Sequence, residues 1–176
     1  MQTIKAAVYR AFGEPLTIED IQIADPKMGE VEVTLDACAV CHSDISYADG
    51  AWGGQLPAVY GHEAAGKVTA IGDGVTGLKL GDPVVVTLIR ACGSCANCSS
   101  GKPVICETSN DTAGPLTDTA GQQIVQSMNS GAFAEKVVVD QSQVVVMPDD
   151  MPMDAASLLA CGVITGVGAV VNAANL

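Results

Sequence analysis

The sequence predicts a mainly β fold, and its composition favours this class over a helical bundle. Nineteen glycines and eight prolines are spread through 176 residues, which is typical of a chain with many turns. Hydrophobic residues make up 48% of the chain but aromatic residues only 3%, so the core is expected to consist of Val, Ile, Leu and Ala. The apolar content also excludes a disordered chain.

Apolar runs bounded by turn-forming residues predict the strands in order along the chain. The expected strands are 4–8, 17–23, 30–39, 63–71, 84–89, 135–139 and 144–146. In the third of these, Val31, Val33, Leu35 and Ala37 alternate with other residues, so this strand is expected to bury one face only. Between the strands, residues 41–57 predict a loop with one helical turn, and 108–131 a long irregular segment.

The end of the chain is predicted to be helical. The helix is expected to begin near Asp154, whose side chain can cap it, and to run with an interruption at Gly162 towards Asn175. The apolar run at 158–171, about fourteen residues, is too short to span a bilayer comfortably. Although Gly162 and Gly166 have the spacing of a membrane dimer motif, we expect a buried helix of a soluble protein.

The charge of the chain excludes two classes of partner. Eight basic and twenty acidic residues give a net charge of −12, which repels nucleic-acid phosphates and anionic lipid headgroups. We therefore expect neither nucleic acid nor membrane as a partner. No apolar signal segment follows Met1, and clustered cysteines suit a reducing compartment, so the expected localisation is cytoplasmic.

Four of the seven cysteines form a compact cluster, which is the strongest local signal in the sequence. Cys92, Cys95 and Cys98 are followed by Cys106, and four thiolates at this spacing can surround one tetrahedral zinc ion. The absence of His, Asp and Glu among the first three ligands favours a closed structural site. An iron–sulfur cluster remains an alternative, although its fourth cysteine usually follows after three residues. Disulfides or free thiols are further alternatives.

A second candidate set is dispersed along the chain. Cys41, His62 and Cys161 together would form the pattern of a catalytic zinc site, with a fourth position open to water or substrate. Dispersed ligands meet only in the folded chain, and a lone buried cysteine is more often inert core. The residues alone therefore leave both interpretations open, and Cys38 is expected to be a small buried residue on a strand.

Four motifs, in order along the chain, resemble those of the zinc-dependent medium-chain alcohol dehydrogenases. They are GHEAAG at 61–66 followed by Gly72 and Val75, GDPVV at 81–85, the cysteine cluster, and LACGVITG at 159–166. The resemblance covers essentially the whole chain. It implies a GroES-like β-barrel at 1–150, which includes a structural-zinc lobe at 91–107. It also implies a helical segment at 151–176 that completes the catalytic site and leads into a Rossmann domain.

The dinucleotide-binding domain implied by this resemblance is not expected within the 176 residues. Gly166 and Gly168 have no preceding strand and no third glycine at the required place, so they do not form a dinucleotide fingerprint. The chain is therefore expected to be the catalytic half of a dehydrogenase and to be inactive by itself.

The resemblance also implies the chemistry. It implies oxidation of an alcohol to an aldehyde or ketone through a zinc-bound alkoxide, with hydride transfer to NAD or NADP supplied by the full-length enzyme. Cys41, His62 and Cys161 are the implied ligands of the catalytic zinc. Glu63 is implied to lie behind or on the zinc; the alternative is that it is a solvated charge. Asp44 is implied to accept the other ring N–H of His62; the alternative is that it is a turn cap.

The remaining implied roles concern the proton and the cofactor. Ser43 would accept the proton of the alcohol, or would be a helix or turn cap. Ser46 stands where many relatives carry the histidine that finishes the proton relay. His42 would contact the cofactor pyrophosphate or would be a surface histidine. Trp52 and Leu88 resemble walls of the substrate pocket, although either could belong to the core.

A non-enzymatic, zinc-stabilised barrel that binds a protein partner is the alternative function. An open Cys₂His site argues against it, because an interaction module has no use for an unsaturated zinc. The expected partners are a small alcohol or aldehyde and further copies of the chain. Homo-oligomers are expected because the apolar surface of the last helix would otherwise be exposed. The substrate and the choice between NAD and NADP stay open.

Overall fold

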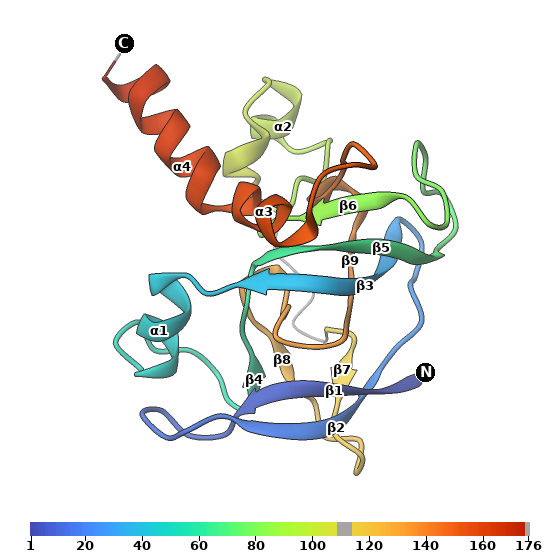
Figure 1. Cartoon of the computed structure of the whole chain (residues 1–176), viewed down its shortest axis with the longest axis vertical. Coiled ribbons are helices and arrows are strands. Elements are labelled where there is room, and N and C mark those ends of the chain that lie inside the picture. The colour runs from blue at the N-terminus through green and yellow to red at the C-terminus, as the bar shows by residue number, and fades with distance from the viewer. Residues whose placement is uncertain (109–113, 175–176) are drawn as a thin grey trace.

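The computed structural model describes residues 1–108 and 114–174, and it consists of two five-stranded sheets with helices at one side and one end (Figure 1). One sheet has the strand order β7-β2-β1-β4-β8, with β1 (Gln2–Tyr9), β2 (Thr17–Ile23), β4 (Ala58–Val59), β7 (Leu116–Thr117) and β8 (Val125–Gln126). The other has the order β10-β6-β5-β3-β9, with β3 (Glu30–Ala39), β5 (Glu63–Ile71), β6 (Pro83–Val86), β9 (Lys136–Asp140) and β10 (Val144–Val146). The mainly β prediction is confirmed.

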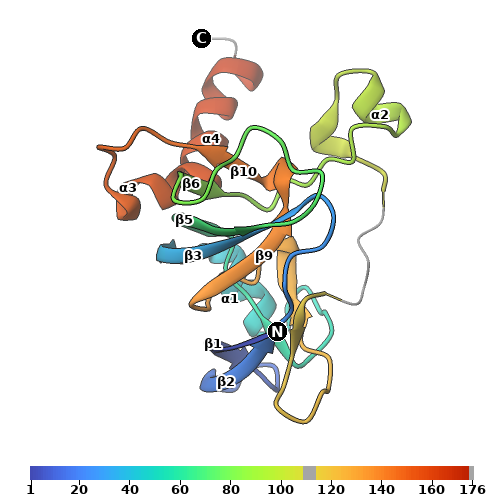
Figure 2. The ribbon, with the colours of Figure 1, turned by 90° about the vertical axis from the view of Figure 1, so that its right-hand side faces the viewer.

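The helices are short. They are α1 (His42–Ala48), α2 (Ala96–Ser99), α3 (Met153–Ser157) and α4 (Gly162–Gly168). Single 3₁₀ turns occupy Pro103–Ile105, Ser127–Asn129, Gln141–Gln143 and Leu158–Ala160, and a π-helical turn at Ala169–Ala173 extends α4. Figure 2 shows α2 in a lobe that projects from the two sheets, whereas α3 and α4 lie beyond β5 and β6.

The core is aliphatic, as its composition predicts, and one strand segment joins the two sheets across it. Phe133 accepts a hydrogen bond from the backbone of Ala7 in β1 (2.8 Å), and Glu135 donates one to Lys5 (3.0 Å). The next residues then leave β1 and pair with β3 along the whole of β9. The buried side chains of the two sheets are mostly Val, Ile and Ala, and hydrophobic burial is the main favourable term in folding.

Strand β3 differs from the half-buried strand that alternation predicts, because Glu32 on its polar face is also buried. The Glu32 side chain is 1% exposed, and its Oε1 accepts hydrogen bonds from Lys136 Nζ (2.9 Å) and Thr69 Oγ1 (2.6 Å). Gln2 Nε2 donates to Oε2 (2.8 Å). A buried carboxylate is tolerated here because every oxygen has a partner. Alternation cannot reveal such pairing between distant residues.

Several predicted boundaries also need correction. Strand β6 ends at Val86 and not at residue 89, because its partner β10 pairs no further than Val86. Helix α1 spans seven residues where only one helical turn is predicted. Two two-residue strands, β7 and β8, interrupt the segment predicted to be irregular, and 109–113 in this segment lie outside the described residues.

The C-terminal helical segment begins and breaks at different residues from those predicted. Pro152 is the N-cap of α3, and Asp154 lies in its first turn, where its carboxylate accepts a hydrogen bond from the Ala155 backbone (2.9 Å). The break falls at Cys161, whose φ of −145° and ψ of −65° are not helical. The predicted end near Asn175 lies outside the described residues.

The described part of the chain contains no single helix that is long and apolar enough to cross a membrane. Only the pair Met153–Ala160 and Gly162–Ala173, which is bent by 51°, has the required length and composition when its two parts are taken together.

Candidate metal centres

The projecting lobe brings four cysteine sulfur atoms together. Their Sγ atoms all lie within 4.8 Å of one another, with 4.0 Å between Cys92 and Cys98 and 4.0 Å between Cys95 and Cys106. A tetrahedral zinc ion with bonds of about 2.3 Å holds its sulfur ligands about 3.8 Å apart, whereas a disulfide requires about 2.05 Å. The spacing therefore fits four thiolates around one ion and excludes disulfides between these pairs.

Hydrogen-bond donors around the lobe favour thiolates. The Cys92 sulfur accepts hydrogen bonds from the backbone N–H groups of Cys95 (3.2 Å) and Ser94 (3.4 Å). The Thr108 hydroxyl and these donors lower the pKa of Cys92 to about 5. Burial, by contrast, raises the pKa of Cys98 to about 12, so a metal ion has to displace a proton there.

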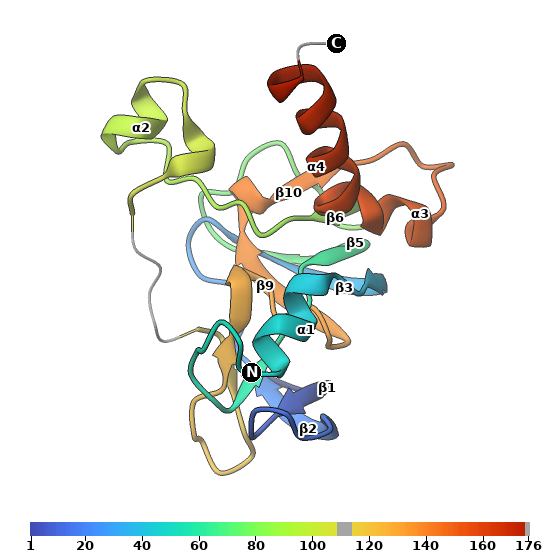
Figure 3. The same cartoon turned by 90° about the vertical axis from the view of Figure 1, so that its left-hand side faces the viewer.

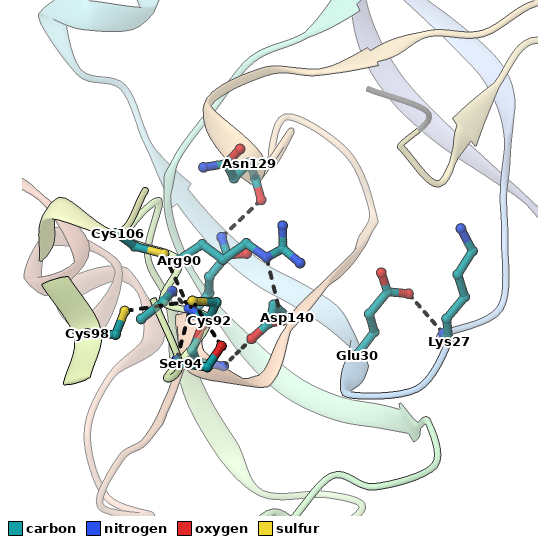
Figure 4. A network of polar contacts seen from close by, with 12 residues as sticks. Lys27, Glu30, Arg90, Cys92, Ser94, Cys98, Cys106, Asn129 and Asp140 are labelled. Atoms are coloured by element: carbon teal, nitrogen blue, oxygen red, sulfur yellow. Dashed lines mark hydrogen bonds and ion pairs between the residues drawn. The ribbon is translucent and has the colours of Figure 1, made fainter. Parts of the chain in front are cut away.

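The lobe is attached to the barrel next to Arg90. Figure 4 shows the sulfur atoms of Cys92, Cys98 and Cys106 gathered on one side of Arg90, whose side chain extends away from them towards Asp140. Arg90 Nε lies 3.5 Å from Asp140 Oδ2, and the neighbouring Ala91 N–H donates to Ser142 Oγ (3.0 Å). These contacts hold the base of the lobe against the second sheet.

The dispersed set also comes together in the structure. One donor atom from each of Cys41, His62, Glu63 and Cys161 lies within 4.8 Å of the others. Antiparallel pairing of β3 with β5 places Ala39 opposite Glu63, so the residues just after β3 and just before β5 are neighbours. Cys161 arrives from the break between the Leu158–Ala160 turn and α4. Figure 1 shows α1 and the start of α4 at the same end of β3 and β5.

Asp44 positions two of these donors. This side chain is 3% exposed; its Oδ2 accepts the backbone N–H of Cys41 (2.9 Å), and its Oδ1 accepts that of Gly61 (3.0 Å). The same Oδ1 lies 3.1 Å from His62 Nδ1, which leaves Nε2 as the nitrogen available to a metal. Burial lowers the pKa of His62, but hydrogen bonds and charge from Asp44 and Cys41 together raise it, so the pKa lies above its ordinary value.

Helix α1, which carries Asp44, is fixed by aromatic packing. Tyr47 stacks on the buried Tyr60 with 5.7 Å between ring centroids, and Trp52 meets Tyr47 edge-on at 5.2 Å. Figure 3 shows α1 beside the ends of β3 and β5, below α3 and α4. Trp52 itself is 58% exposed, so it does not belong to the core.

The residue before His62 has to be glycine. Gly61 has a φ of +91°, and a Cβ there would lie 2.6 Å from Phe133 Cδ1 and 2.7 Å from its backbone nitrogen. A side chain would therefore displace the segment that carries His62.

Glu63 and Cys161 complete the arrangement. Glu63 is 4% exposed, and a Cβ at Gly162 would lie 3.8 Å from its Oε2, so the carboxylate faces the start of α4. Burial raises the pKa of Cys161 to about 11, and charge on Cys41 and Glu63 adds to the effect. Two sulfur atoms, one nitrogen and one carboxylate oxygen are a donor set that suits zinc, and a cation would relieve their mutual repulsion.

Other predicted residues lie outside the cluster of donor atoms. Ser43 is half-buried on α1, His42 is exposed as the first residue of this helix, and Leu88 is half-buried after β6. Cys38 lies on β3, as predicted, but it is half-buried rather than fully buried, and burial raises its pKa to about 12.

Thr87 is a further residue beside the site, and it is not among the predicted ones. Its Oγ1 donates a hydrogen bond to the carbonyl oxygen of Ala160 (3.1 Å), next to Cys161. No sequence signal could have identified this contact, since a threonine at the end of a strand is ordinary.

Comparison with known proteins identifies the family of the chain. Residues 27–149 match the family described as "Alcohol dehydrogenase GroES-like domain". The alcohol dehydrogenase class-3 of Drosophila melanogaster is 38% identical over 99% of this chain and 48% of its own length. The S-(hydroxymethyl)glutathione dehydrogenase of Komagataella pastoris is 38% identical over 98% of this chain and also 48% of its own length.

Solved structures resemble the chain over nearly its whole length. An alcohol dehydrogenase zinc-binding domain protein from Burkholderia ambifaria has a TM-score of 0.91 and 35% identity over 98% of this chain and 49% of its own. Benzyl alcohol dehydrogenase from Acinetobacter calcoaceticus has a TM-score of 0.86 and 31% identity over the same shares. The chain thus spans about half the length of the relatives that it matches. Its fold and sequence place it in the family of alcohol dehydrogenase GroES-like domains.

Proposed function

We propose that this chain is the catalytic domain of a zinc-dependent alcohol dehydrogenase, which oxidises a small alcohol to an aldehyde or ketone with NAD or NADP. The observation that carries this proposal is the convergence of Cys41, His62, Glu63 and Cys161 within 4.8 Å at the end of β3 and β5. Two cysteines and one histidine leave the fourth position of a tetrahedral zinc ion to an exchangeable ligand, as a catalytic site requires. The names of the relatives add that alcohols are their substrates.

The two donor groups divide the zinc chemistry between them. Cys92, Cys95, Cys98 and Cys106 would hold a structural ion, because four thiolates leave no open position. Cys41, His62 and Cys161 would hold a second ion, with Glu63 beside them to assist exchange of the remaining ligand. When bound, zinc at this second site supplies a Lewis acid that polarises an alcohol oxygen and makes its proton easier to remove.

The neighbouring residues would manage protons and orientation. Asp44 holds the ring of His62 by Nδ1, which keeps Nε2 free of a proton and directed at the metal. Ser43, on the turn after Cys41, would accept the hydroxyl proton of the substrate. Because Ser46 replaces the histidine that many relatives use, we propose that the proton leaves through water. His42, exposed at the start of α1, would contact the cofactor pyrophosphate.

The organisation of the whole enzyme is part of the same proposal. Residues 1–150, which include the lobe at 91–107, would form the catalytic barrel. Residues 151–176 would complete the catalytic site and lead into the nucleotide-binding domain that supplies most of the NAD or NADP contacts. We further propose that the enzyme is cytoplasmic, and that the chain without its nucleotide-binding domain forms homo-oligomers through the exposed apolar face of α4.

Metal analysis with cobalt as a spectroscopic substitute tests the catalytic site directly. The chain should bind two ions, and Cys161→Ser should lose one of them while the lobe keeps the other. We call the site of Cys41, His62 and Cys161 the open site. Cobalt at the open site should change its visible spectrum when benzyl alcohol is added, whereas cobalt at the four cysteines of the lobe should not. One ion per chain would contradict the proposal and favour the interaction module. Two cobalt ions whose visible spectra both stay unchanged on addition of the alcohol would do the same.

Activity tests the cofactor half of the proposal. Residues 1–176, joined to the nucleotide-binding half of the Burkholderia ambifaria relative, should reduce NAD or NADP with a primary or aromatic alcohol. The isolated chain should not, because hydride transfer needs a cofactor positioned near the zinc. A chimera that binds two zinc ions and NADH but turns over no alcohol would overturn the assignment.

A further inference from the structure

The three cysteine and histidine donors of the open site are not held in the same way. Asp44 fixes the backbone of Cys41 and of Gly61 and the ring of His62, so one carboxylate positions the first two donors. None of the hydrogen bonds of Asp44 reaches Cys161, which comes from the other end of the chain. Some other group must fix this third donor.

We propose that Thr87 is the positioning residue for Cys161. The inference rests on the proposed catalytic metal site and adds a residue to it. Thr87 follows β6, and its Oγ1 donates a hydrogen bond to the carbonyl oxygen of Ala160 (3.1 Å). Thr87 Oγ1 also accepts the N–H of Ile89 (3.4 Å), so its own hydroxyl proton is directed at Ala160.

Thr87 is itself held by a buried side chain. The backbone N–H of Thr87 donates to the Gln143 carbonyl oxygen (2.9 Å), and Gln143 Nε2 donates back to the Thr87 carbonyl oxygen (2.9 Å). Gln143 is 2% exposed, and the same Nε2 also donates to the Asn129 carbonyl oxygen (3.0 Å). The threonine therefore presents its hydroxyl from a fixed backbone.

Apolar packing alone does not fix the direction of Cys161. Ala156 and Ala160 are buried against Ala65 and Val85, and these contacts hold α3 and the following turn on the sheet. Hydrophobic contacts are not directional, so they do not define the orientation of the peptide planes. The backbone then leaves the helical conformation at Cys161, with φ −145° and ψ −65°. The carbonyl oxygen of Cys161 accepts the N–H of Thr165 (2.9 Å), which ties the residue to α4 but does not orient it relative to the sheet.

The hydrogen bond to Ala160 supplies that direction. The carbonyl oxygen of Ala160 and the nitrogen and Cα of Cys161 belong to one planar peptide unit. Fixing the oxygen therefore fixes the plane from which the Cys161 side chain departs. Its sulfur then lies within 4.8 Å of the donor atoms of Cys41, His62 and Glu63.

Two pairs of variants isolate the hydroxyl. Thr87→Val keeps the shape of the side chain without the hydroxyl, and Thr87→Ser keeps the hydroxyl without the methyl group. Thr87→Ala provides a second comparison with Thr87→Ser, because these two differ only in the hydroxyl and share any cavity. This second pair decides the question if Thr87→Val fails to fold.

Dissociation constants for zinc at both centres, measured by competition with a chromophoric chelator, test the inference. Loss of an outer contact of this type typically weakens metal binding 10- to 100-fold, and we expect Thr87→Val and Thr87→Ala to show this loss at the open site alone. Thr87→Ser should stay within about threefold of the wild type. The lobe, which Thr87 does not contact, should keep its affinity in every variant.

The outcomes separate this inference from the proposed function. If Thr87→Val and Thr87→Ala bind zinc at the open site as tightly as the wild type, Thr87 does not position Cys161. This result would leave the proposed catalytic site unaffected. If both centres weaken together, and Thr87→Ser weakens with them, the residue is merely structural. A wild-type chain that binds zinc only at the lobe would overturn the proposed function and the role of Thr87 together.

Discussion

The two candidate metal centres present the same number of donor atoms within the same 4.8 Å, yet the chain builds them in different ways. The lobe takes all of its donors from one short segment, in which Cys92 and Cys106 are 14 positions apart. The open site takes Cys41 from just after β3, His62 from just before β5 and Cys161 from a break between helices. The first site needs only its own loop, whereas the second depends on the whole barrel.

The lobe, unlike the open site, lacks support from a hydrophobic core. Val104 is 70% exposed and Ile105 is 54% exposed, and none of the four hydrophobic clusters contains a residue of the lobe. Hydrophobic burial therefore contributes little to its conformation, and the thiolates need a counter-ion. The metal is expected to determine the fold of the lobe, while the fold of the barrel determines the open site.

The largest expected effect follows from removing the structural metal. Cys95→Ser should abolish tight metal binding at the lobe, where a structural zinc ion contributes on the order of 10 kcal/mol. Amide hydrogen exchange should show that the lobe loses its protection, while β3 and β5 keep theirs because the barrel core is separate. Protection of the lobe that survives both Cys95→Ser and a chelator would refute the comparison.

Asp44→Asn should have the next largest effect, and at the other centre. An amide cannot accept on both sides, so at least one of the buried N–H groups of Cys41, Gly61 and His62 loses its partner. We expect the free energy of unfolding to fall by about 2 to 4 kcal/mol and zinc affinity at the open site to fall about 10- to 100-fold. Urea titration and chelator competition measure the two quantities.

The exposed carboxylate of Asp36 on β3 provides the matched control. Asp36→Asn should change neither quantity, since surface substitutions usually stay within about 0.5 kcal/mol. If Asp44→Asn weakens the lobe as much as the open site, the two centres are not independent and the contrast between them fails.

The same contrast explains what the sequence could reveal. The spacing of Cys92, Cys95, Cys98 and Cys106 identifies a metal centre by itself, because neighbours in the sequence stay neighbours in the fold. Nothing in the residues alone joins Cys41 to Cys161, and the resemblance to a family supplied that set. Antiparallel pairing of β3 with β5 explains why Cys41 meets His62, whereas Cys161 comes from the break before α4.

The predicted elements behaved in a similar way. Strands β2, β3, β5 and β10 have the predicted bounds, because their apolar pattern and flanking turns are local signals. The burial of Glu32 and the hydrogen bond of Thr87 to Ala160 could not be predicted, since both depend on partners far away in the sequence. Polar contacts between residues far apart in the chain produce no periodic pattern in the sequence.

The ion pair of Glu32 with Lys136 tests whether the barrel is stable independently of both metals. Burial raises the pKa of Glu32, but hydrogen bonds from Lys136 and Thr69 lower it more, so the pKa in the folded chain lies below its ordinary 4.5. A lowered pKa contributes stability above the ordinary value, and this contribution disappears as the pH falls through the folded value.

The expected result is a pH-dependent difference between two chains. At pH 7, with a chelator present, Glu32→Gln should be less stable than the wild type by about 2 kcal/mol, and the difference should shrink as the pH falls below the ordinary pKa of 4.5. Urea unfolding at several pH values measures it, and Glu14→Gln at an exposed position is the control. A difference that appears only when metal is bound would show that the barrel and the metal centres are coupled.

The smallest change in folding stability is expected on the exposed face of α4, next to the open site. Val167 in α4 is 56% exposed, and Val171 in the π-helical turn that extends α4 is 53% exposed; Val163, Ile164 and Val170 are exposed as well. Apolar patches of this kind drive association. The double substitution Val167→Asp with Val171→Asp should therefore convert oligomers into monomers while it changes the free energy of unfolding by about 0.5 kcal/mol or less per site.

Light scattering and circular dichroism on the wild type and the double variant measure the mass and the helix content. Ile18→Asp, at a residue that is 67% exposed on β2, introduces the same charge far from α4 and should leave the oligomer intact. If the wild type is already a monomer with the same helix content as the double variant, the face does not mediate association. If Ile18→Asp dissociates the oligomer instead, the first sheet forms the interface, and the open site lies away from it.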